Sequence, residues 1–345
     1  MARLSADRRG AIMQEIPVGE AGRSPLRNRV MSTKTVSPLL MSCFAALLGC
    51  AALSAGQAIK ADLLSTPLEP TSISQWSRDL AYKGTEIYPL TLDALGCPLI
   101  KVDVSGVQVS LTLDTGTSRG FVLTDHAPAV PHRVEERHEE LNADGSHRGE
   151  SLSIRVEEMS VLGRVFKNVA GSLSDWRMFS SQPFDGTVGL DFFLDRRLTL
   201  DYRSLSVGAT TAPLPAKLDP KHYVTADLID PPRSQGHILY ARARVNGRDA
   251  TVYFDTGYNV SFIDPGFCEG LARVERPGKF KVFRKAIPME LGGQKFILDE
   301  LREDPIKRGA GFDPPVALTL GSDILSHFVV TIDIRAKKII MAPAR

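Results

Sequence analysis

Two stretches decide how this chain folds: Leu111-Thr-Leu-Asp114-Thr115-Gly116-Thr117-Ser118 and its near-copy Val252-Tyr-Phe-Asp255-Thr256-Gly257. In each, an alternating apolar strand leads directly into Asp-Thr-Gly. One such tripeptide would arise by chance in roughly one chain in fifteen of this length. Two copies after matching strands indicate a repeat.

The repeat extends well beyond the two tripeptides, and internal repeats should be sought before any other feature. A glycine precedes each aspartate by eight residues, and further downstream a Gly-to-Asp spacing of twelve also occurs twice. The upstream pairs are Gly106 with Asp114 and Gly247 with Asp255, and the downstream pairs are Gly189 with Asp201 and Gly321 with Asp333. One module has therefore been duplicated and fused.

Composition limits the classes to which the protein can belong. The chain has 345 residues, 43% of them hydrophobic and 24% charged, which gives room for two globular cores. The formal net charge is only +2 and the basic residues are scattered, so nucleic acid is not an expected partner.

The N-terminal part predicts export. Met31 opens a stretch with a basic residue, Lys34, and an apolar run over 39–53 that is too short for a membrane span. Gly56-Gln-Ala58 suits cleavage by a signal peptidase. We therefore interpret 1–60 as an N-terminal extension and signal peptide, with Met31 as the expected true start, and expect a periplasmic or secreted protein.

The cysteines leave two questions open. Leu47-Leu-Gly-Cys50 resembles the lipobox of bacterial lipoproteins, so lipidation of Cys50 and membrane attachment compete with ordinary secretion. Cys97 and Cys268 remain in the mature chain. An exported compartment permits a disulfide between them, although two unpaired structural cysteines are the favoured interpretation.

Beyond the signal, short apolar strands and turn residues predict a mostly β structure with few helices. The stretch 61–85 has the Pro, Ser and Thr content of a linker, with a short helix expected near 75–82. The first module is predicted over 86–208 and the second over 237–345. Between them, 209–236 is rich in proline and forms the expected connection.

The paired aspartates point to a specific chemistry. Two carboxylates held a few ångström apart cannot both ionise, so they share one proton and titrate as a unit. Such a pair supplies a general base and a general acid together. Gly116 and Gly257 would let the two loops approach closely, Thr115 and Thr256 could bond across to the opposite loop, and Thr117 could bond its neighbouring carboxylate.

With both motifs in place, the chain resembles the pepsin and retropepsin-like aspartic peptidases in their single-chain, bilobal form. The resemblance covers roughly 99–207 and 238–341 and includes Thr187-Val-Gly189 and Thr319-Leu-Gly321. It implies an all-β acid-protease fold with two pseudo-symmetric barrel-like lobes. It also implies a catalytic dyad of Asp114 and Asp255, and a hairpin with Asp144-Gly145 at its tip closing over an extended peptide or protein substrate. No cofactor or metal is implied, and a monomer is expected.

The chain departs from this pattern in two places. Tyr258 stands where the family usually has Ser or Thr, and no tyrosine occurs between Asp114 and Glu150, where a flap tyrosine would lie. These departures leave an alternative function, a catalytically inactive peptide-binding or envelope scaffold of the same fold. A dimer of the retroviral kind is a further alternative, against which the internal duplication argues. His126, His132, His138 and His147 have spacings that fit no metal-ligand pattern on one helix or loop.

Overall fold

Six strands from the first half of the chain close on themselves around an apolar interior. The computed structural model describes residues 64–117, 120–141, 147–174, 184–231, 236–277, 282–306 and 311–345, all within one unit that spans 37–345. Within these residues the first barrel follows the order β4 (Pro98–Val104), β5 (Val107–Leu113), β10 (Gly186–Val188), β6 (Phe121–Thr124), β9 (Arg164–Ser174) and β8 (His147–Val161). It closes because β8 also pairs with β4.

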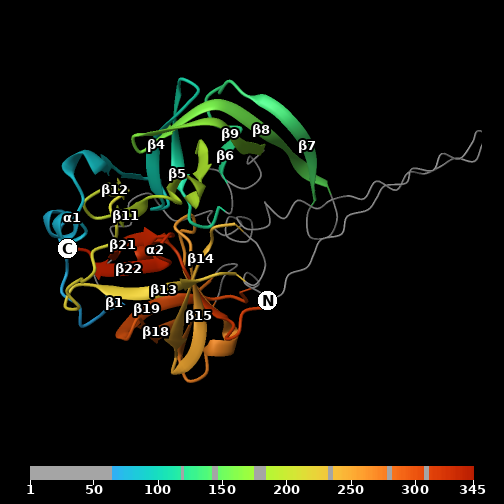
Figure 1. The fold of residues 1–345 in the computed structure, drawn as a ribbon. Helices are drawn as coiled ribbons and strands as arrows, with labels where there is room; N and C mark the ends of the chain where they lie inside the picture. Colours follow the sequence, from blue (N-terminus) through green and yellow to red (C-terminus); the bar gives the residue numbers. More distant parts are fainter. Residues whose placement is uncertain are drawn as a thin grey trace, which may run out of the picture. The chain divides into compact units, whose positions relative to one another are not determined.

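The second half repeats this order strand for strand. The described part of its barrel runs β14 (Leu239–Val245), β15 (Arg248–Phe254), β20 (Val316–Leu320), β16 (Phe262–Ile263), β19 (Gln294–Glu303) and β18 (Val282–Leu291). It closes through pairing of β18 with β14. The predicted all-β fold with two pseudo-symmetric, barrel-like lobes is confirmed, and Figure 1 shows the two lobes above and below the middle of the view.

The strand that leads into each Asp-Thr-Gly lies in the wall of its barrel, hydrogen-bonded between two other strands. β5 pairs in parallel with β10, and β15 pairs in parallel with β20. Every residue of β10 and β20 is buried, including Thr187 and Thr319, so neither segment alternates between buried and exposed positions. Both aspartates therefore follow strands that are packed on both sides.

A further set of strands joins the two halves in one sheet. Its order is β13 (Val224–Ile229), β22 (Lys338–Pro343), β21 (Phe328–Asp333), β11 (Arg197–Asp201), β12 (Ser206–Thr210) and β2 (Ile87–Pro89). β11 comes from the first half and β21 from the second, and they pair antiparallel, with Leu200 opposite Val330. All residues of β11, β12 and β21 are buried, so this shared sheet is part of the core.

The segment before the first barrel packs against this shared sheet, although its composition predicts a linker. The expected helix forms as α1 (Ile73–Asp79), followed by the 3₁₀ turn η2 (Gly84–Glu86) (Figure 1). Trp76 and Leu80, four residues apart, are both fully buried. The Trp76 indole N–H donates to Asp201 Oδ2 at 2.9 Å. Helical spacing of two large apolar side chains thus outweighed the Pro, Ser and Thr content of the segment.

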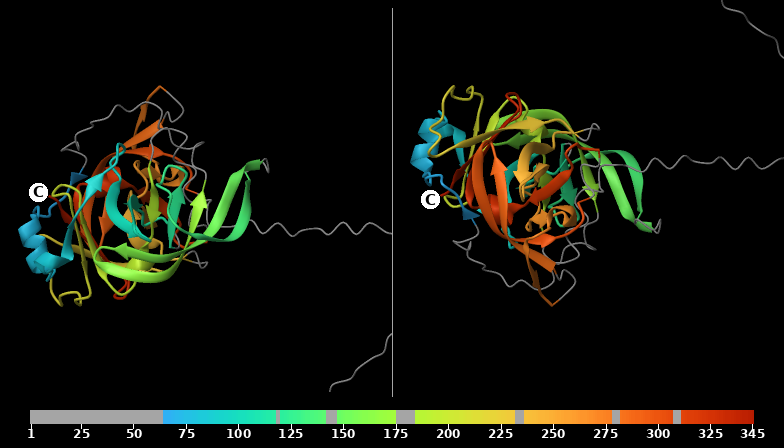
Figure 2. Two further views of the ribbon diagram at one scale, coloured as in Figure 1. Left: turned by 90° about the horizontal axis from the view of Figure 1, so that it is seen from above. Right: turned by 90° about the horizontal axis from the view of Figure 1, so that it is seen from below.

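The remaining elements lie at edges and loops of the described sheets. They are β1 (Leu64–Ser65), β3 (Thr91–Leu92), β7 (Arg133–Leu141), the 3₁₀ turns η3 (Leu190–Phe193) and η4 (Pro265–Phe267), β17 (Ala272–Glu275) and α2 (Ser322–Leu325). β7 and β8 form a long hairpin that projects beyond the first barrel in both views of Figure 2. Among the described residues no helix is long and apolar enough to cross a bilayer. The predicted domain boundaries stay predictions.

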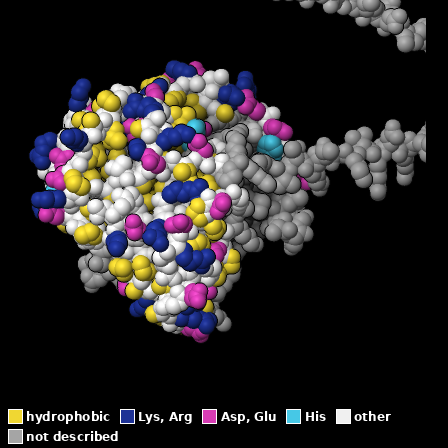
Figure 3. All heavy atoms as spheres, turned by 60° about the horizontal axis from the view of Figure 1, so that its bottom comes forward, with side chains coloured by type: hydrophobic (Ala, Val, Ile, Leu, Met, Phe, Trp, Pro, Cys, Tyr) yellow, Lys and Arg dark blue, Asp and Glu magenta, His cyan; other side chains and the backbone are white. Residues whose placement is uncertain are grey.

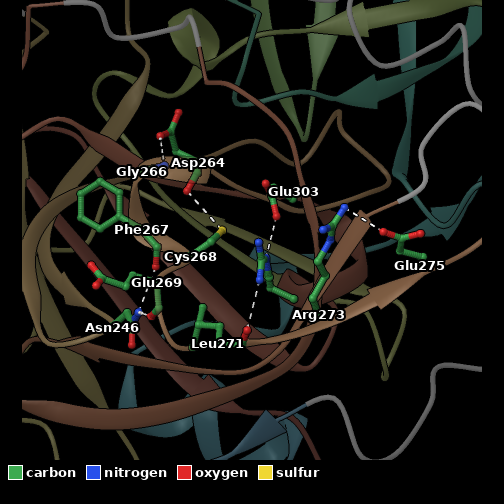
Figure 4. A network of polar contacts seen from close by, with 11 residues as sticks. Asn246, Asp264, Gly266, Phe267, Cys268, Glu269, Leu271, Arg273, Glu275 and Glu303 are labelled. Atoms are coloured by element: carbon green, nitrogen blue, oxygen red, sulfur yellow. Dashed lines mark hydrogen bonds and ion pairs between the residues drawn. The ribbon is translucent and has the colours of Figure 1, made fainter.

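Both cysteines of the described chain are free and buried, in agreement with the favoured interpretation. Cys268 lies in a polar network of the second lobe, shown in Figure 4, where its Sγ contacts the Asp264 carbonyl oxygen at 3.5 Å. Burial raises the pKa of the Cys268 thiol to about 11. Next to it, Arg284 donates to the Glu303 carboxylate at 2.6 Å. A protonated thiol in such packing has a structural role.

Candidate active site

Each candidate catalytic aspartate stands where a central barrel strand ends. Asp114 follows β5, and its backbone N–H donates to the Val188 carbonyl at 3.0 Å. Asp255 follows β15, and its N–H donates to the Leu320 carbonyl at 2.9 Å. The two residues are 3% and 2% exposed. Buried strands therefore fix the backbone from which each carboxyl projects.

Reciprocal hydrogen bonds hold the two Asp-Thr-Gly loops together. The Thr115 hydroxyl donates to the Phe254 carbonyl at 2.9 Å and accepts from the Thr256 N–H at 3.0 Å. In the mirror arrangement, the Thr256 hydroxyl donates to the Leu113 carbonyl at 2.5 Å and accepts from the Thr115 N–H at 3.0 Å. Both threonines are buried. The predicted cross-loop bonds are formed, and they set the separation of the two lobes at this point.

The glycine of each loop lies directly against the carboxyl of the other. A Cβ on Gly116 would fall 2.3 Å from Asp255 Oδ2, and a Cβ on Gly257 would fall 2.5 Å from Asp114 Cγ. No side chain fits at those distances, so glycine is required at both positions. Asp114 and Asp255, 141 residues apart in the chain, thus share one buried site.

Backbone and hydroxyl donors orient each carboxyl. For Asp114, the Gly116 N–H donates to Oδ1 at 2.7 Å and the Thr117 hydroxyl to Oδ2 at 2.7 Å. The Thr117 hydroxyl also lies 2.9 Å from that of Thr187, in the Thr-Val-Gly motif. The predicted bond from Thr117 is therefore formed, and the downstream motif supports it.

For Asp255, a residue that sequence reasoning missed supplies the second donor. The Gly257 N–H donates to Oδ1 at 3.0 Å, as in the first loop. Oδ2 instead accepts the phenol of Tyr253 at 2.5 Å. One signal could have found Tyr253: it lies two residues before Asp255 on a strand, so both side chains project from the same face.

Tyr258, which stands where pepsin-like peptidases usually have Ser or Thr, packs its side chain against a residue of its own lobe. Its ring meets the ring of Phe262 edge-on, with centroids 5.6 Å apart. The Tyr258 backbone keeps the geometry of the first loop, since its N–H donates to the Asp255 carbonyl at 3.2 Å, as that of Thr117 does to Asp114. The substitution has therefore changed the side chain at this position and left the loop backbone intact.

Burial and proximity set the electrostatics of the pair. Burial first, and then the charge of Asp114 and a hydrogen bond with it, raise the pKa of Asp255 well above its usual range. A carboxyl that keeps its proton beside an ionised neighbour can donate a hydrogen bond while the neighbour accepts one. This arrangement can perform general acid and general base catalysis at one site.

A second layer of carboxylates supports the two loops. Asp191 and Asp323 stand in the first turns of η3 and α2. The Asp191 carboxylate also accepts from the Gly120 N–H at 2.9 Å, and that of Asp323 accepts from the Ser261 N–H at 2.9 Å. Each lobe thus ties its downstream helical turn to the segment that leaves its Asp-Thr-Gly loop.

Cys97 packs behind the paired loops. Its thiol donates to the Gly257 carbonyl at 3.6 Å, so a residue of the first lobe contacts the loop of the second. Burial first, and then the negative charges of Asp93, Asp114 and Asp255, raise the pKa of this thiol well above its usual value. The neutral thiol therefore serves as packing and as a weak donor behind the carboxyl pair.

The predicted flap is the hairpin of β7 and β8, and its tip, with Asp144 and Gly145, lies outside the described residues. Within the described part, Glu139 pairs with Glu150 across the hairpin. His138 Nε2 lies 2.9 Å from the Ser153 hydroxyl, so this histidine is engaged across the two strands. The substrate-binding role of the hairpin stays a prediction.

Comparison with known proteins supports the fold, whereas the catalytic chemistry is inferred from the geometry of the site alone. No protein-family model matches the chain, and no curated protein matches it. Among solved structures, it is similar to the crystal structure of the aspartic proteinase from Irpex lacteus, with a TM-score of 0.52 and 12% identity over 75% of this chain and 97% of that one. At such low identity the likeness shows a shared pepsin-like bilobal fold.

Proposed function

We propose that this protein is an exported aspartic endopeptidase that hydrolyses peptide bonds with Asp114, Asp255 and a water molecule. The observation that carries the proposal is the reciprocal packing of the two loops, in which each glycine contacts the opposite aspartate. A duplicated fold retained only for peptide binding has no need of two buried carboxyls in contact, because burying ionisable groups costs free energy.

The proposed mechanism returns the dyad to its starting state. The ionised carboxylate takes a proton from water as the water oxygen attacks the scissile carbonyl carbon, while the protonated carboxyl donates its proton to the carbonyl oxygen. Collapse of the tetrahedral intermediate breaks the C–N bond. The leaving nitrogen receives a proton from the protonated carboxyl of the dyad, while the other carboxylate takes a proton from one hydroxyl of the intermediate, whose oxygen becomes the carbonyl oxygen of the new carboxylic acid. The pair ends with one proton, as it began, and neither carboxyl forms a covalent intermediate.

An unbiased peptide mixture tests the proposal. The purified mature protein is incubated with the mixture from acidic to neutral pH, with and without pepstatin, and new termini are identified by mass spectrometry. Asp114→Asn serves as the control for contaminating proteases. Cleavage that the substitution removes supports the proposal and defines the preference for side chains at the cleaved bond. A wild-type protein that binds peptides and cuts none would favour the inactive scaffold.

Adding one methyl group to Gly257 is a separate prediction about geometry. Gly257→Ala should lower kcat/KM by about 100-fold, because the new Cβ displaces the Asp114 carboxyl from its productive position. Gly84→Ala is the matched control, since a Cβ there meets no atom within 4 Å. Equal activity of the two variants would contradict the placement of Gly257 against Asp114.

Export, and a monomeric mature protein, belong to the same proposal. Cleavage after Ala58 would release the chain, whereas lipidation at Cys50 would anchor it. A single chain supplies both carboxyls, which supports a monomer. On the face shown in Figure 3, basic and acidic side chains are interspersed, as suits a peptide or protein substrate better than a polyanion. Mass spectrometry of the N-terminus of the mature protein distinguishes cleavage after Ala58 from lipidation at Cys50.

A further inference from the structure

The two carboxyls of the candidate dyad are held alike at one oxygen and differently at the other. In both loops, the N–H of the glycine two residues after the aspartate donates to Oδ1. At Oδ2, Asp114 accepts the aliphatic hydroxyl of Thr117, and Asp255 accepts the phenol of Tyr253. The internal duplication has therefore kept the donor to this oxygen and has changed the residue that supplies it.

Residue 258 is the position from which this donor would come by symmetry. The backbone N–H groups of Thr117 and Tyr258 donate to the carbonyl of their aspartate at the same distance, 3.2 Å. A threonine at 258 would accordingly stand where Thr117 stands in the first loop. The tyrosine found there has its ring against Phe262, over which the Arg302 guanidinium lies 4.0 Å from the ring centroid.

Tyr253 is rigidly placed to act instead. It is 1% exposed, and its ring packs against that of Tyr240 with centroids 5.1 Å apart. The Tyr240 ring in turn packs against the Phe312 ring, with centroids 4.6 Å apart, and Val316 belongs to the same apolar cluster. A phenol on such a support loses little side-chain entropy when it bonds a carboxylate.

We propose that Tyr253 is the positioning residue that fixes Oδ2 of Asp255. Its phenol replaces the hydroxyl that Thr117 supplies to Asp114 in the first loop. The inference rests on the proposed function and extends it to the division of labour within the dyad. A donor to the ionised form also stabilises the singly protonated pair against a second proton. Loss of the phenol should therefore misplace the Asp255 carboxyl. It should also let the pair take its second proton at a higher pH, so that activity on the acid side of the pH profile is lost at a higher pH than in the wild type.

Other ionisable groups face this carboxyl and frame the pH dependence. Asp114 lies opposite, Cys97 lies behind the Gly257 carbonyl, and Tyr202 contacts the Ser322 hydroxyl at 3.1 Å in the next layer. Asp323 belongs to the same layer and bonds Ser261. Burial raises the pKa of Cys97, Tyr202 and Asp323, and both the thiol and the phenol stay neutral under acidic conditions. Titration on the acid side is accordingly dominated by carboxyl groups.

Four variants test the inference through activity. Tyr253→Phe keeps the ring and removes the donor, and it should lower kcat about 10- to 100-fold with KM within about threefold of wild type. The acid limb of the pH profile should move to higher pH. Tyr253→Phe combined with Tyr258→Thr should recover kcat to within about threefold of Tyr258→Thr alone. Tyr223→Phe is the matched control, because that buried tyrosine donates to Asp79 instead of the dyad.

The outcomes separate this inference from the proposed function. Full activity in Tyr253→Phe, or a loss that threonine at 258 does not restore, overturns the inference and leaves the endopeptidase proposal standing. If the wild-type protein cleaves nothing, the proposed function fails, and the inference is then decided by carbon-13 NMR of labelled aspartate carboxyls, assigned with Asp255→Asn. An upward shift of the Asp255 titration in Tyr253→Phe supports it, and an unchanged titration overturns it.

Discussion

Asp114→Asn and Asp255→Asn should each lower kcat/KM for peptide cleavage by about 10³-fold or more. An amide can neither take a proton from water nor hold the shared proton, so either substitution removes the acid–base pair as a unit. The shape of the side chain is retained, and the amide oxygen can still accept the glycine N–H, while the amide NH2 can donate to the neighbouring hydroxyl. Because the two residues act together, the double variant should be no worse than either single one.

The same substitution at Asp255 should have the opposite effect on stability. Burial and Asp114 raise the pKa of Asp255, so the folded protein holds a proton that the unfolded chain has lost. Stability therefore falls as pH rises from the ordinary carboxyl range through the raised pKa. At neutral pH, Asp255→Asn should unfold at a higher temperature than the wild type, and the difference should disappear below about pH 4.

Thermal unfolding of both proteins from pH 3 to pH 8 measures this difference, with Asp249→Asn as a control at an exposed position on the same strand. Reduced activity together with raised stability at neutral pH would identify a carboxyl kept for chemistry at the expense of the fold. A variant that is inactive and also less stable at neutral pH would contradict the electrostatic account, since it would show that Asp255 is favourable to folding.

The sequence predicts the dyad because the information for it is local. Each Asp-Thr-Gly follows an apolar strand, and the repeated spacing of Gly106 and Gly247 before Asp114 and Asp255 shows that the two strands occupy matching places. Once the modules are paired about an approximate twofold axis, the two loops must meet. The cross-loop threonine bonds and the glycine contacts then follow from residue size and hydrogen-bonding capacity.

Tyr253 could not be assigned in the same way. Within Val252-Tyr-Phe it looks like one more apolar strand residue, and its role depends on the rotamer that Tyr240 and Phe312 impose from other parts of the chain. The sequence also does not show which sheet Trp76 packs against, because its hydrogen-bond partner Asp201 lies 125 residues away. In both cases the side chain is placed by contacts between segments that are distant in the sequence, and composition does not predict such contacts.

Thr115→Val should destabilise the protein by about 2–5 kcal/mol, because it removes the partner of two buried backbone groups at once. The hydroxyl of Thr115 bonds the Phe254 carbonyl and the Thr256 N–H, and valine has the same shape with no polar atom. For a chain of this size the midpoint of thermal unfolding should fall by roughly 5–15 °C. Cleavage should be lost as well, since the loops are no longer held in register.

Thr115→Ser is the matched control, because serine keeps the hydroxyl and removes only a methyl group, at a cost of about 1 kcal/mol. A large gap between the valine and serine variants, in unfolding midpoint and in kcat, would assign the effect to the cross-loop hydrogen bonds. Equal losses in the two variants would assign it to the methyl group and its packing. Thr256→Val should repeat the result, since its hydroxyl makes the mirror pair of bonds to Leu113 and Thr115. A duplicated site predicts equal losses of stability and activity at the two positions, because Thr115 and Thr256 make equivalent hydrogen bonds to the opposite loop.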